Sequence, residues 1–383
     1  MTASASTAAS ASSLAPIGIL DPEGQLLPGA EDPRLEREQL LAMYRGMLRI
    51  RVLDERMLAL QRQGRIGFVG TATGQEASVV GSAAGLAPSD WIFPGLREGG
   101  AALFRGMPLE EYVGQMYCNT YDTAKGRQMC NHFQHQAGNF VSWSSVIGTQ
   151  LPQAVGAAFA AKLRGERTVC AAYLGDGATS SGGFHCAATF AGVWKAPVVF
   201  LIIDNGWAIS VPACKQSAAA SLALKGKTYG LPSRSIDGND LFACYVETRA
   251  AVERVRAGGA PEILHLKTYR MMGHSSSDDP TRYRDAAEVE AWSKRDPIAR
   301  AKRYLEGRAW IDDARDAALR EELDAEIRGV IKTVEAAAPM ALSTLVEDVY
   351  AEVPAHLRRQ YNAFLESARK HGDARPSDVP FPL

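Results

Sequence analysis

Two apolar runs that end in short polar turns most constrain the fold of this chain. The run Thr168–Leu174 is followed by the tripeptide GDG at 175–177, and the run Pro197–Ile203 is followed by the dipeptide DN at 204–205. Buried strands joined by a helix-length segment are typical of parallel sheets, which need crossover connections. Neighbouring parallel strands end at the same edge of a sheet, where α/β folds bind ligands. We therefore expect Asp176 and Asn205 to lie close together at this edge.

The chemistry of the two turns favours a cation and a diphosphate as ligands. A carboxylate from Asp176 and an amide oxygen from Asn205 suit Mg²⁺, which takes few protein ligands and completes its octahedron with water and phosphate oxygens. Gly175 and Gly177 let a diphosphate approach the backbone, and a helix expected after Gly183 would offer it free N–H groups. The alternative is a glycine-rich turn in which Asp176 only caps a helix. Because Asn205 follows after one crossover, we favour the ligand site.

The rest of the pattern predicts an α/β fold with a mostly parallel sheet flanked by helices and with helical N- and C-terminal extensions. Short apolar runs alternate with helical stretches over 68–270, which indicates crossover helices. A third strand is expected at Glu262–Tyr269. Apolar periodicity or runs of small residues predict helices at 35–63, 150–162, 286–306 and 313–337.

One large domain is expected, because nothing resembles a long linker. We expect a disordered Ala/Ser-rich tail over 1–16, an extended lead-in over 17–34, an α/β domain over 35–340 and a C-terminal extension over 341–383. No basic residue precedes Arg34, so neither a secretory signal nor an arginine-rich transit peptide is indicated. We therefore expect a cytoplasmic protein of bacterial type.

Composition excludes several classes of partner. The 42 Lys and Arg residues nearly balance 43 Asp and Glu residues, so the basic excess of a nucleic-acid or membrane-surface binder is missing. No run approaches the ~20 apolar residues of a membrane span. The six cysteines are scattered and form no C-x-x-C pair, which argues against a disulfide framework or a zinc site and favours a reducing compartment.

The two polar turns resemble a known cofactor motif. GDG, 26 residues (178–203) and then Asp204-Asn205 resemble the thiamine diphosphate motif, with Asp204 in place of its first asparagine. Longer stretches resemble the α subunit of the two-subunit 2-oxo acid dehydrogenases: QRQGRIGFVGTATGQEA (61–77), KGRQMCNHF (125–133), GTQLPQAVGAA (148–158), VFLIIDNGWAIS (199–210) and YRMMGHSSSDDPTRYR (269–284). AEDPRL (30–35) and DVYAEVPAHLRRQ (348–360) resemble the branched-chain members. Residues 35–340 would then form a thiamine diphosphate-binding fold.

The resemblance implies a set of cofactor ligands. Asp176, Asn205 and the Trp207 carbonyl would hold Mg²⁺, and Arg97 would pair with the diphosphate, although a surface salt bridge is the alternative for Arg97. Ile147 would bend the cofactor as an apolar wedge, whereas taken alone it is a core residue. Further implied contacts are Ser145 near the aminopyrimidine, Gly175, Gly177, Ala178, Ile209, His274 and Arg270, which contacts phosphate or orders its loop.

Two further sets of residues have implied roles. His274 and Ser275 are the catalytic candidates, because an imidazole can bind the substrate carboxylate or exchange protons. In animal relatives the serine that matches Ser275 is phosphorylated. A K⁺ ion is implied at Ser144, Val146, Thr149 and Gln150, with capping of the next helix as the alternative. His132 lines the mouth of the site or is structural.

The resemblance also implies partners. No activating glutamate is found in this chain, and in the family a β subunit supplies it within a heterotetramer of two α and two β subunits. The complex would decarboxylate a small 2-oxo acid, preferably branched-chain, and transfer the acyl group to the lipoyl arm of a dihydrolipoyl acyltransferase core; no nucleic acid or membrane partner is expected.

Three alternatives remain open for the function, and a fourth lacks its motif. Pyruvate dehydrogenase and acetoin dehydrogenase α subunits have the same features. A non-catalytic structural subunit stays open because the stretch 180–187 (SSGGFHCA), Gly95-Leu96 and Ile203 depart from the family pattern. A Rossmann dinucleotide enzyme would need a G-x-G-x-x-G turn after a strand, which we do not find.

Overall fold

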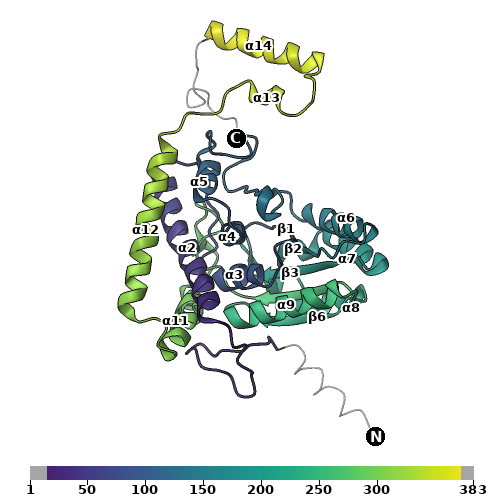
Figure 1. The fold of residues 1–383 in the computed structure, drawn as a ribbon, viewed down its shortest axis with the longest axis vertical. Coiled ribbons are helices and arrows are strands. Elements are labelled where there is room, and N and C mark those ends of the chain that lie inside the picture. The colour runs from purple at the N-terminus through teal and green to yellow at the C-terminus, as the bar shows by residue number, and fades with distance from the viewer. Residues whose placement is uncertain (1–14, 372–383) are drawn as a thin grey trace. The chain divides into compact units, whose positions relative to one another are not determined.

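The computed structural model describes residues 15–371 and divides the chain into two compact units (Figure 1). The first unit ends at Ala337 and the second begins at Ala338. Most of the tail predicted over 1–16, and the end of the predicted C-terminal extension from residue 372, lie outside the described residues.

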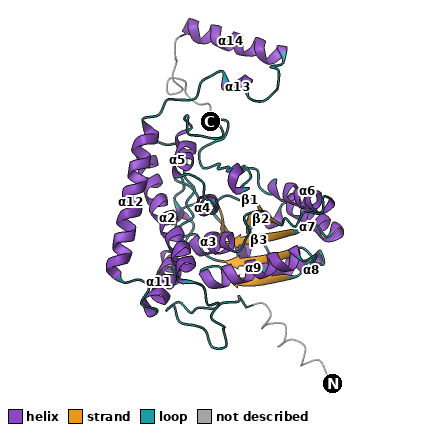
Figure 2. Cartoon of the chain, viewed as in Figure 1, coloured by secondary structure: helices purple, strands orange, loops and turns teal. Residues whose placement is uncertain are grey.

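The first unit is built on a five-stranded, fully parallel sheet with the strand order β1-β2-β3-β7-β6 (Figure 2). This sheet confirms the predicted fold class, and the three predicted strands all form. The strands are β1 (Trp91–Phe93), β2 (Cys170–Gly175), β3 (Val198–Asp204), β6 (Ser233–Asp237) and β7 (Glu262–Lys267). Beyond β3, a short antiparallel ribbon follows, made of β4 (Trp207–Ala208) and β5 (Val211–Pro212).

Both faces of the sheet are covered, because successive strand residues point to opposite sides. In β3, Val199, Leu201 and Ile203 belong to a core shared with α2 (Arg37–Arg62), α3 (Glu76–Ala84) and α9 (Leu241–Arg256). The alternate residues Val198, Phe200 and Ile202 belong to a second core shared with α6 (Gln150–Leu163) and α7 (Gly182–Trp194). Burial on both faces explains why the central strands β2 and β3 are apolar at nearly every position.

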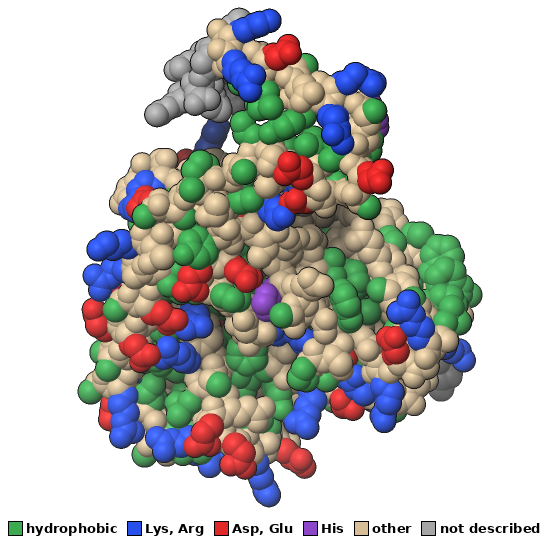
Figure 3. All heavy atoms as spheres, turned by 45° about the horizontal axis from the view of Figure 1, so that its top comes forward, with side chains coloured by type: hydrophobic (Ala, Val, Ile, Leu, Met, Phe, Trp, Pro, Cys, Tyr) green, Lys and Arg blue, Asp and Glu red, His purple; other side chains and the backbone are tan. Residues whose placement is uncertain are grey.

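The small-residue helix predicted at 150–162 is α6, which packs against α7. Its buried Ala154 and Ala158 share a core with Ala187 and Ala191 of α7. On the outside of these two helices, large apolar side chains are exposed, and the space-filling view shows them as a hydrophobic cluster at its right edge (Figure 3). They are Leu163, Phe190, Val193 and Trp194.

Two helix predictions need correction. The segment 286–306 is not one helix but α10 (Ala286–Ser293) and α11 (Pro297–Gly307), since Asp296 caps α11 by accepting hydrogen bonds from the backbone N–H groups of Ile298 and Ala299. The helix expected after Gly183 begins at Gly182, and a 3₁₀ turn over Gly177–Ser180 precedes it.

The remaining helices of the first unit are α4 (Gly99–Phe104), α5 (Leu109–Tyr117), α8 (Lys225–Thr228) and α12 (Asp313–Glu335). They pack mainly on other helices, such as α12 on α2 and α5. The lead-in joins the fold: Ile17 pairs in parallel with Ile236, and the N–H groups of Ile19 and Leu20 donate to Asp240 at 2.6 and 2.7 Å.

The second unit contains α13 (Thr344–Glu347) and α14 (Ala355–His371), which contact each other. Several of its apolar side chains are exposed, among them Leu345, Val349 and Phe364. Across the described part of the chain, no helix combines the length and apolarity needed to cross a membrane.

Candidate active site

The carboxyl ends of β2 and β3 open into a cavity of about 600 Å³. Gly175 pairs in register with Ile203, so Asp176 and Asn205 follow directly from adjacent strand ends, as the sequence predicts. Both residues are buried and both line the cavity.

Most of the residues implied by the resemblance share this cavity. Its lining includes Arg97, Ser144, Ser145, Ile147, Gln150, Gly175, Asp176, Gly177, Ala178, Asn205, Trp207, Ile209 and His274. Four others are not part of its lining: Val146, Thr149, Arg270 and Ser275. Ile147 is 62 % exposed and therefore is not a core residue.

Side-chain amides hydrogen-bond to both Asp176 and Asn205, and the Asn205 oxygen accepts from the Trp207 N–H at 3.2 Å. The amide of Gln216 donates to Asp176 Oδ2 at 2.7 Å, and the amide of Asn205 donates to Gln75 Oε1 at 3.1 Å. Burial, and secondly the charge of Asp204, raise the pKa of Asp176 to about 6. No cluster of three or more His, Cys, Asp or Glu side chains forms a metal site within residues 15–371. A cation bound here would have few protein ligands. Mg²⁺ is typically bound in this way, with water and phosphate oxygens completing its coordination.

Arg97 carries a buried charge, and no carboxylate among residues 15–371 is bonded to its guanidinium. Its Nη1 donates to the Thr71 carbonyl, and its Nη2 donates to the His274 carbonyl at 2.7 Å. Burial, and secondly the nearby charge of Arg270, lower the pKa of Arg97 to about 10. The buried guanidinium of Arg97 is suited to binding an anionic ligand. Because Arg97 is buried, the alternative of a surface salt bridge does not apply.

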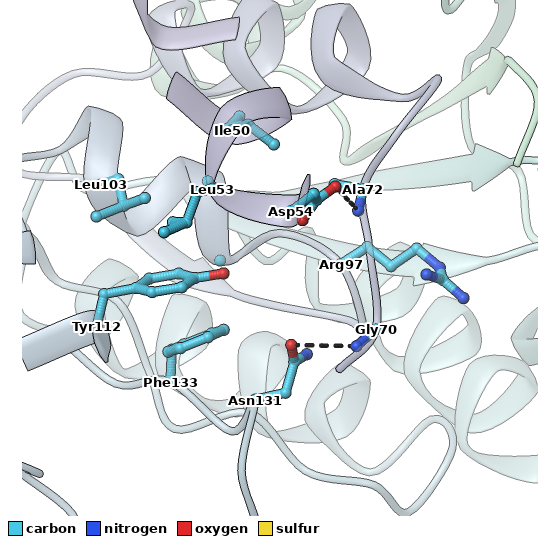
Figure 4. A pocket seen from close by; sticks show the side chains of 12 residues that line it. Ile50, Leu53, Asp54, Gly70, Ala72, Arg97, Leu103, Tyr112, Asn131 and Phe133 are labelled. Carbon is cyan, nitrogen blue, oxygen red and sulfur yellow. Dashed lines mark hydrogen bonds between the residues drawn. The ribbon is translucent and has the colours of Figure 1, made fainter. Parts of the chain in front are cut away.

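A second, much smaller cavity of about 10 Å³ lies behind Arg97 (Figure 4). There Asp54 of α2 accepts a hydrogen bond from the Ala72 N–H at 2.8 Å, and Asn131 accepts one from the Gly70 N–H at 3.3 Å. Figure 4 shows the Arg97 side chain pointing away from this space. The volume is that of about one water molecule. These contacts fix the segment 70–72 whose Thr71 carbonyl orients Arg97.

Arg270 organises the loop after β3. It is fully buried, and its Nη2 donates to the Ile209 carbonyl and to the Tyr283 hydroxyl, each at 2.7 Å. Its Nη1 donates to the Trp207 carbonyl at 3.3 Å. Ile209 has a φ of 55°, which is unusual for a β-branched residue and needs such support. Of the two roles considered for Arg270, these contacts favour the ordering of a loop.

His274 stands between two arginines at the cavity wall. Its backbone N–H donates to Asp278 Oδ2 at 2.6 Å, and its Nδ1 lies 3.4 Å from Arg97 Nη2. Burial, then the charges of Arg97 and Arg270, lower the pKa of His274 to about 4, while Asp278 opposes this shift. The imidazole is therefore neutral at neutral pH and can accept a proton or a hydrogen bond.

We expect histidine-labelled protein to show a His274 titration midpoint near pH 4 by NMR, with His274→Gln identifying the resonance. Because the folded pKa lies below the unfolded value of 6.5, the contribution of His274 to stability is complete above pH 6.5 and is lost as the pH falls toward 4. Added diphosphate should raise the midpoint by offsetting the charges of Arg97 and Arg270. A midpoint at or above 6.5 without ligand would contradict this electrostatic account.

The K⁺ candidates lie in the turn before α6 and, for Gln150, at its first residue. The Gln150 amide donates to the Tyr173 carbonyl at 2.8 Å, and Ser144 Oγ accepts from the Val146 N–H at 3.2 Å. Thr149 is the N-cap of α6 but makes no side-chain capping bond, which weighs against the capping alternative. Ser145 Oγ instead contacts His132 Nε2, so His132 does line the cavity.

Sequence reasoning missed several cavity residues. Gln216 follows β5 in a loop without a motif, so no signal could have linked it to Asp176. A signal exists for Gln75, which lies in the stretch 61–77 that resembles the family, and for Glu98, which is adjacent to Arg97. Burial raises the pKa of Glu98 to about 7, and its carboxylate accepts hydrogen bonds from the N–H groups of Gly95 and Arg97, which holds the turn that carries Arg97.

The donors around the cavity fit a diphosphate cofactor. Buried Gln75 Nε2 and Trp207 Nε1 have no hydrogen-bond partner in the part of the chain that the structure describes. A Cβ added at Gly175 would meet no atom within 4 Å, so the backbone there is open to a ligand.

Comparison with known proteins decides the family. A family model described as "Dehydrogenase E1 component" matches residues 44–343. The chain belongs to this E1 dehydrogenase family. It is 38 % identical over 363 residues to "2-oxoisovalerate dehydrogenase subunit alpha 2, mitochondrial" of Arabidopsis thaliana, covering 94 % of this chain and 77 % of that protein. Against the mouse (Mus musculus) 2-oxoisovalerate dehydrogenase subunit alpha, the identity is 38 % over 361 residues, with 94 % and 82 % covered.

A third relative extends the same result. The Caenorhabditis elegans subunit of that name is 40 % identical over 339 residues, covering 88 % of this chain and 78 % of its own length. The resemblance to α subunits of the E1 dehydrogenase family is thus confirmed, and this membership implies thiamine diphosphate as the cofactor.

A matched glycine pair tests whether the cofactor lies against Gly175. We expect Gly175→Ala to leave the melting temperature unchanged, because its methyl group meets only empty space, but to lower thiamine diphosphate affinity ~10–100-fold by overlap of ~1–3 kcal/mol. Gly182→Ala is the control, since its Cβ also meets nothing within 4 Å but Gly182 does not line the cavity. Calorimetric titration measures both, and equal affinities in the two variants would count against this placement.

Proposed function

We propose that this chain is the α subunit of the decarboxylating component of a branched-chain 2-oxo acid dehydrogenase. The observation that carries the proposal is the cavity where Asp176, Asn205 and the buried cation Arg97 converge in a member of the E1 family. The names of the relatives support 2-oxoisovalerate-type substrates. A cytoplasmic location remains part of the proposal.

The chain's own residues bind and orient the cofactor in this proposal. Asp176, Asn205 and the Trp207 carbonyl would hold Mg²⁺, and Arg97 would bind the diphosphate. Ile147 and Ile209, both exposed at the cavity wall, would give the cofactor an apolar surface and exclude water. Bound thiamine diphosphate supplies the electron sink for loss of CO₂ from a 2-oxo acid.

The remaining polar groups would handle the substrate and its protons. Neutral His274 would accept a proton or bind the substrate carboxylate, and Ser275 follows it in the same loop. Among the described cavity residues, the one glutamate is Glu98, and its carboxylate is already used by the backbone of its own turn. A β subunit that supplies the activating glutamate therefore belongs to the proposal, as do an α₂β₂ assembly and a lipoyl-bearing acyltransferase core that takes the acyl group.

A K⁺ ion at Ser144, Val146, Thr149 and Gln150 is a further part of the proposal. The Gln150 amide nitrogen is engaged with Tyr173, which leaves its side-chain oxygen for a cation. Decarboxylation measured with and without K⁺, at constant ionic strength, tests it.

Co-expression with a candidate β subunit tests the proposed function. We expect CO₂ release from branched-chain 2-oxo acids that requires both subunits, thiamine diphosphate and Mg²⁺. Preference for pyruvate would move the assignment to pyruvate dehydrogenase, release of acetaldehyde from acetoin would move it to acetoin dehydrogenase, and inactivity with every substrate despite cofactor binding would favour a structural subunit. Activity without a partner, or in Asp176→Ala, would refute the assignment.

A further inference from the structure

Two cysteines face each other beside the cavity, whose lining includes Met129 and His132 on either side of Cys130. Cys118 is the residue that ends α5, and Cys130 lies in the loop that follows. Their Sγ atoms are 3.8 Å apart, and both side chains are partly accessible. Two thiols in contact can be joined by a disulfide once their sulfur atoms close to ~2.05 Å.

The surrounding structure holds this pair in place. Cys118 has a φ of 53°, the left-handed conformation that ends α5. On the other side, the buried side chain of Gln115 donates to the Met129 carbonyl at 2.7 Å and accepts from the His132 N–H at 3.0 Å. These bonds fix the backbone on both sides of Cys130, so the two thiols are aligned by folded structure.

The two thiols differ in their surroundings. Cys118 Sγ and Cys130 Sγ are in hydrogen-bond contact, in which either thiol can be the donor, and Cys130 Sγ also accepts from the backbone N–H groups of Gly67 and Phe68. The bond from Cys118, and then the backbone bonds, lower the pKa of Cys130 against the opposing effect of burial. The same contact and burial raise the pKa of Cys118. Cys130 is thus the nucleophile of the pair, and Cys118 is the thiol that resolves it.

We propose that Cys118 and Cys130 form an oxidation site that a low-molecular-weight disulfide converts into an intrachain disulfide. The Cys130 thiolate attacks one sulfur of the oxidant, forming a mixed disulfide and releasing one thiolate. Cys118 then loses its proton to solvent and attacks Cys130 Sγ, which releases the second thiolate. Two protein thiols are oxidised, and one disulfide is reduced to two thiols.

Oxidation of Cys130 would alter the cavity, because residues next to Cys130 or bonded to it line that cavity. Met129, His132 and Phe68 line the cavity, and the Phe68 N–H is bonded to Cys130 Sγ. Closing the sulfur–sulfur distance from 3.8 Å moves one or both sulfur atoms and so perturbs the bond between Cys130 Sγ and this amide. This second step rests on the proposed function, because it predicts weaker thiamine diphosphate binding by the oxidised form.

Tryptic mapping of the native α–β complex after treatment with glutathione disulfide tests the site. Lys125 and Arg127 separate the cysteines, so a disulfide would join peptide Gly106–Lys125 to peptide Gln128–Lys162. We expect this product in the native protein and in a Cys186→Ser/Cys214→Ser control, which removes two exposed cysteines. Cys118→Ser should instead trap glutathione on Cys130, and Cys130→Ser should leave Cys118 unmodified.

Other results of these experiments would contradict the oxidation site, its effect on the cavity or the proposed function. A cross-link that forms only in denaturant, or glutathione on both cysteines without a cross-link, would overturn the oxidation site. A cross-link with unchanged thiamine diphosphate affinity would overturn the effect on the cavity, for which we expect a several-fold loss that reductant reverses and Cys130→Ser lacks. If neither redox form binds the cofactor, the proposed function fails, while the peptide map still decides the oxidation site.

Discussion

Replacing Asp176 with asparagine is expected to lower the affinity for Mg²⁺–thiamine diphosphate by about 100-fold or more. Asparagine keeps the shape of the side chain and can still accept the hydrogen bond from Gln216, but it removes the one carboxylate in the proposed ligand set. Loss of a buried charge that faces a cation costs ~3–5 kcal/mol. Calorimetric titration of the α–β complex measures the change.

The same substitution should stabilise the protein without its cofactor. Burial raises the pKa of Asp176 to about 6, so ionisation of its carboxyl group opposes folding at neutral pH. We expect a gain of ~1–2 kcal/mol in the free energy of unfolding of the cofactor-free form. The opposite signs of the two effects distinguish a ligand-binding residue from a structural one.

Asp204→Asn is the matched control for Asp176→Asn. Asp204 ends β3, is bonded to His265 Nε2 at 2.9 Å, and does not line the cavity. An asparagine there restores the residue of the family motif, and we expect the cofactor affinity to stay within ~3-fold of the unmodified protein. The proposed ligand set is wrong if Asp204→Asn weakens binding as much as Asp176→Asn does.

Replacing Arg97 with methionine is expected to weaken diphosphate binding ~100-fold with little loss of stability. Its two hydrogen bonds to backbone carbonyls are lost, but the cost of burying an unpaired cation disappears with them. Hydrogen bonds from a charged group to a phosphate contribute ~1.5–3 kcal/mol each, and a guanidinium can make two. Thiamine has no diphosphate, so its weak binding should be the same in both proteins.

Arg105→Met provides the comparison for Arg97→Met. The Arg105 guanidinium also donates only to backbone carbonyls, those of Ala87, Pro88, Asp90 and Gly138, and burial also lowers its pKa. It does not line the cavity. We expect Arg105→Met to cost ~1–3 kcal/mol of stability and to leave cofactor affinity unchanged. Equal affinities for Arg97→Met and Arg105→Met would remove Arg97 from the diphosphate site.

The sequence predicted the elements that depend on local pattern or on parallel topology. Asp176 and Asn205 could be brought together because each directly follows a strand, and adjacent parallel strands end at one edge. The break between α10 and α11 was missed although Asp296-Pro297 is a recognisable helix start. Apolar periodicity outweighed the capping signal in that prediction.

Contacts made by loops could not be predicted. Gln216 reaches Asp176 from 40 positions along the chain, and Arg97 meets His274 across 177 positions. Neither pairing follows from periodicity or strand order, because loop paths depend on the whole tertiary structure. The thiol pair of Cys118 and Cys130 was missed for the same reason.

The double burial of β3 has a consequence for how the chain finds its correct pairing. Residues Val198–Ile203 are apolar at every position and form two cores, so a slip of one position along β2 and β7 would exchange the two sets at little hydrophobic cost. The polar bonds at the end of the strand would be lost, namely Asp204 to His265 and Asn205 to Gln75. The groups beside the cofactor cavity thus also select the strand alignment, and misalignment is penalised by unsatisfied polar atoms.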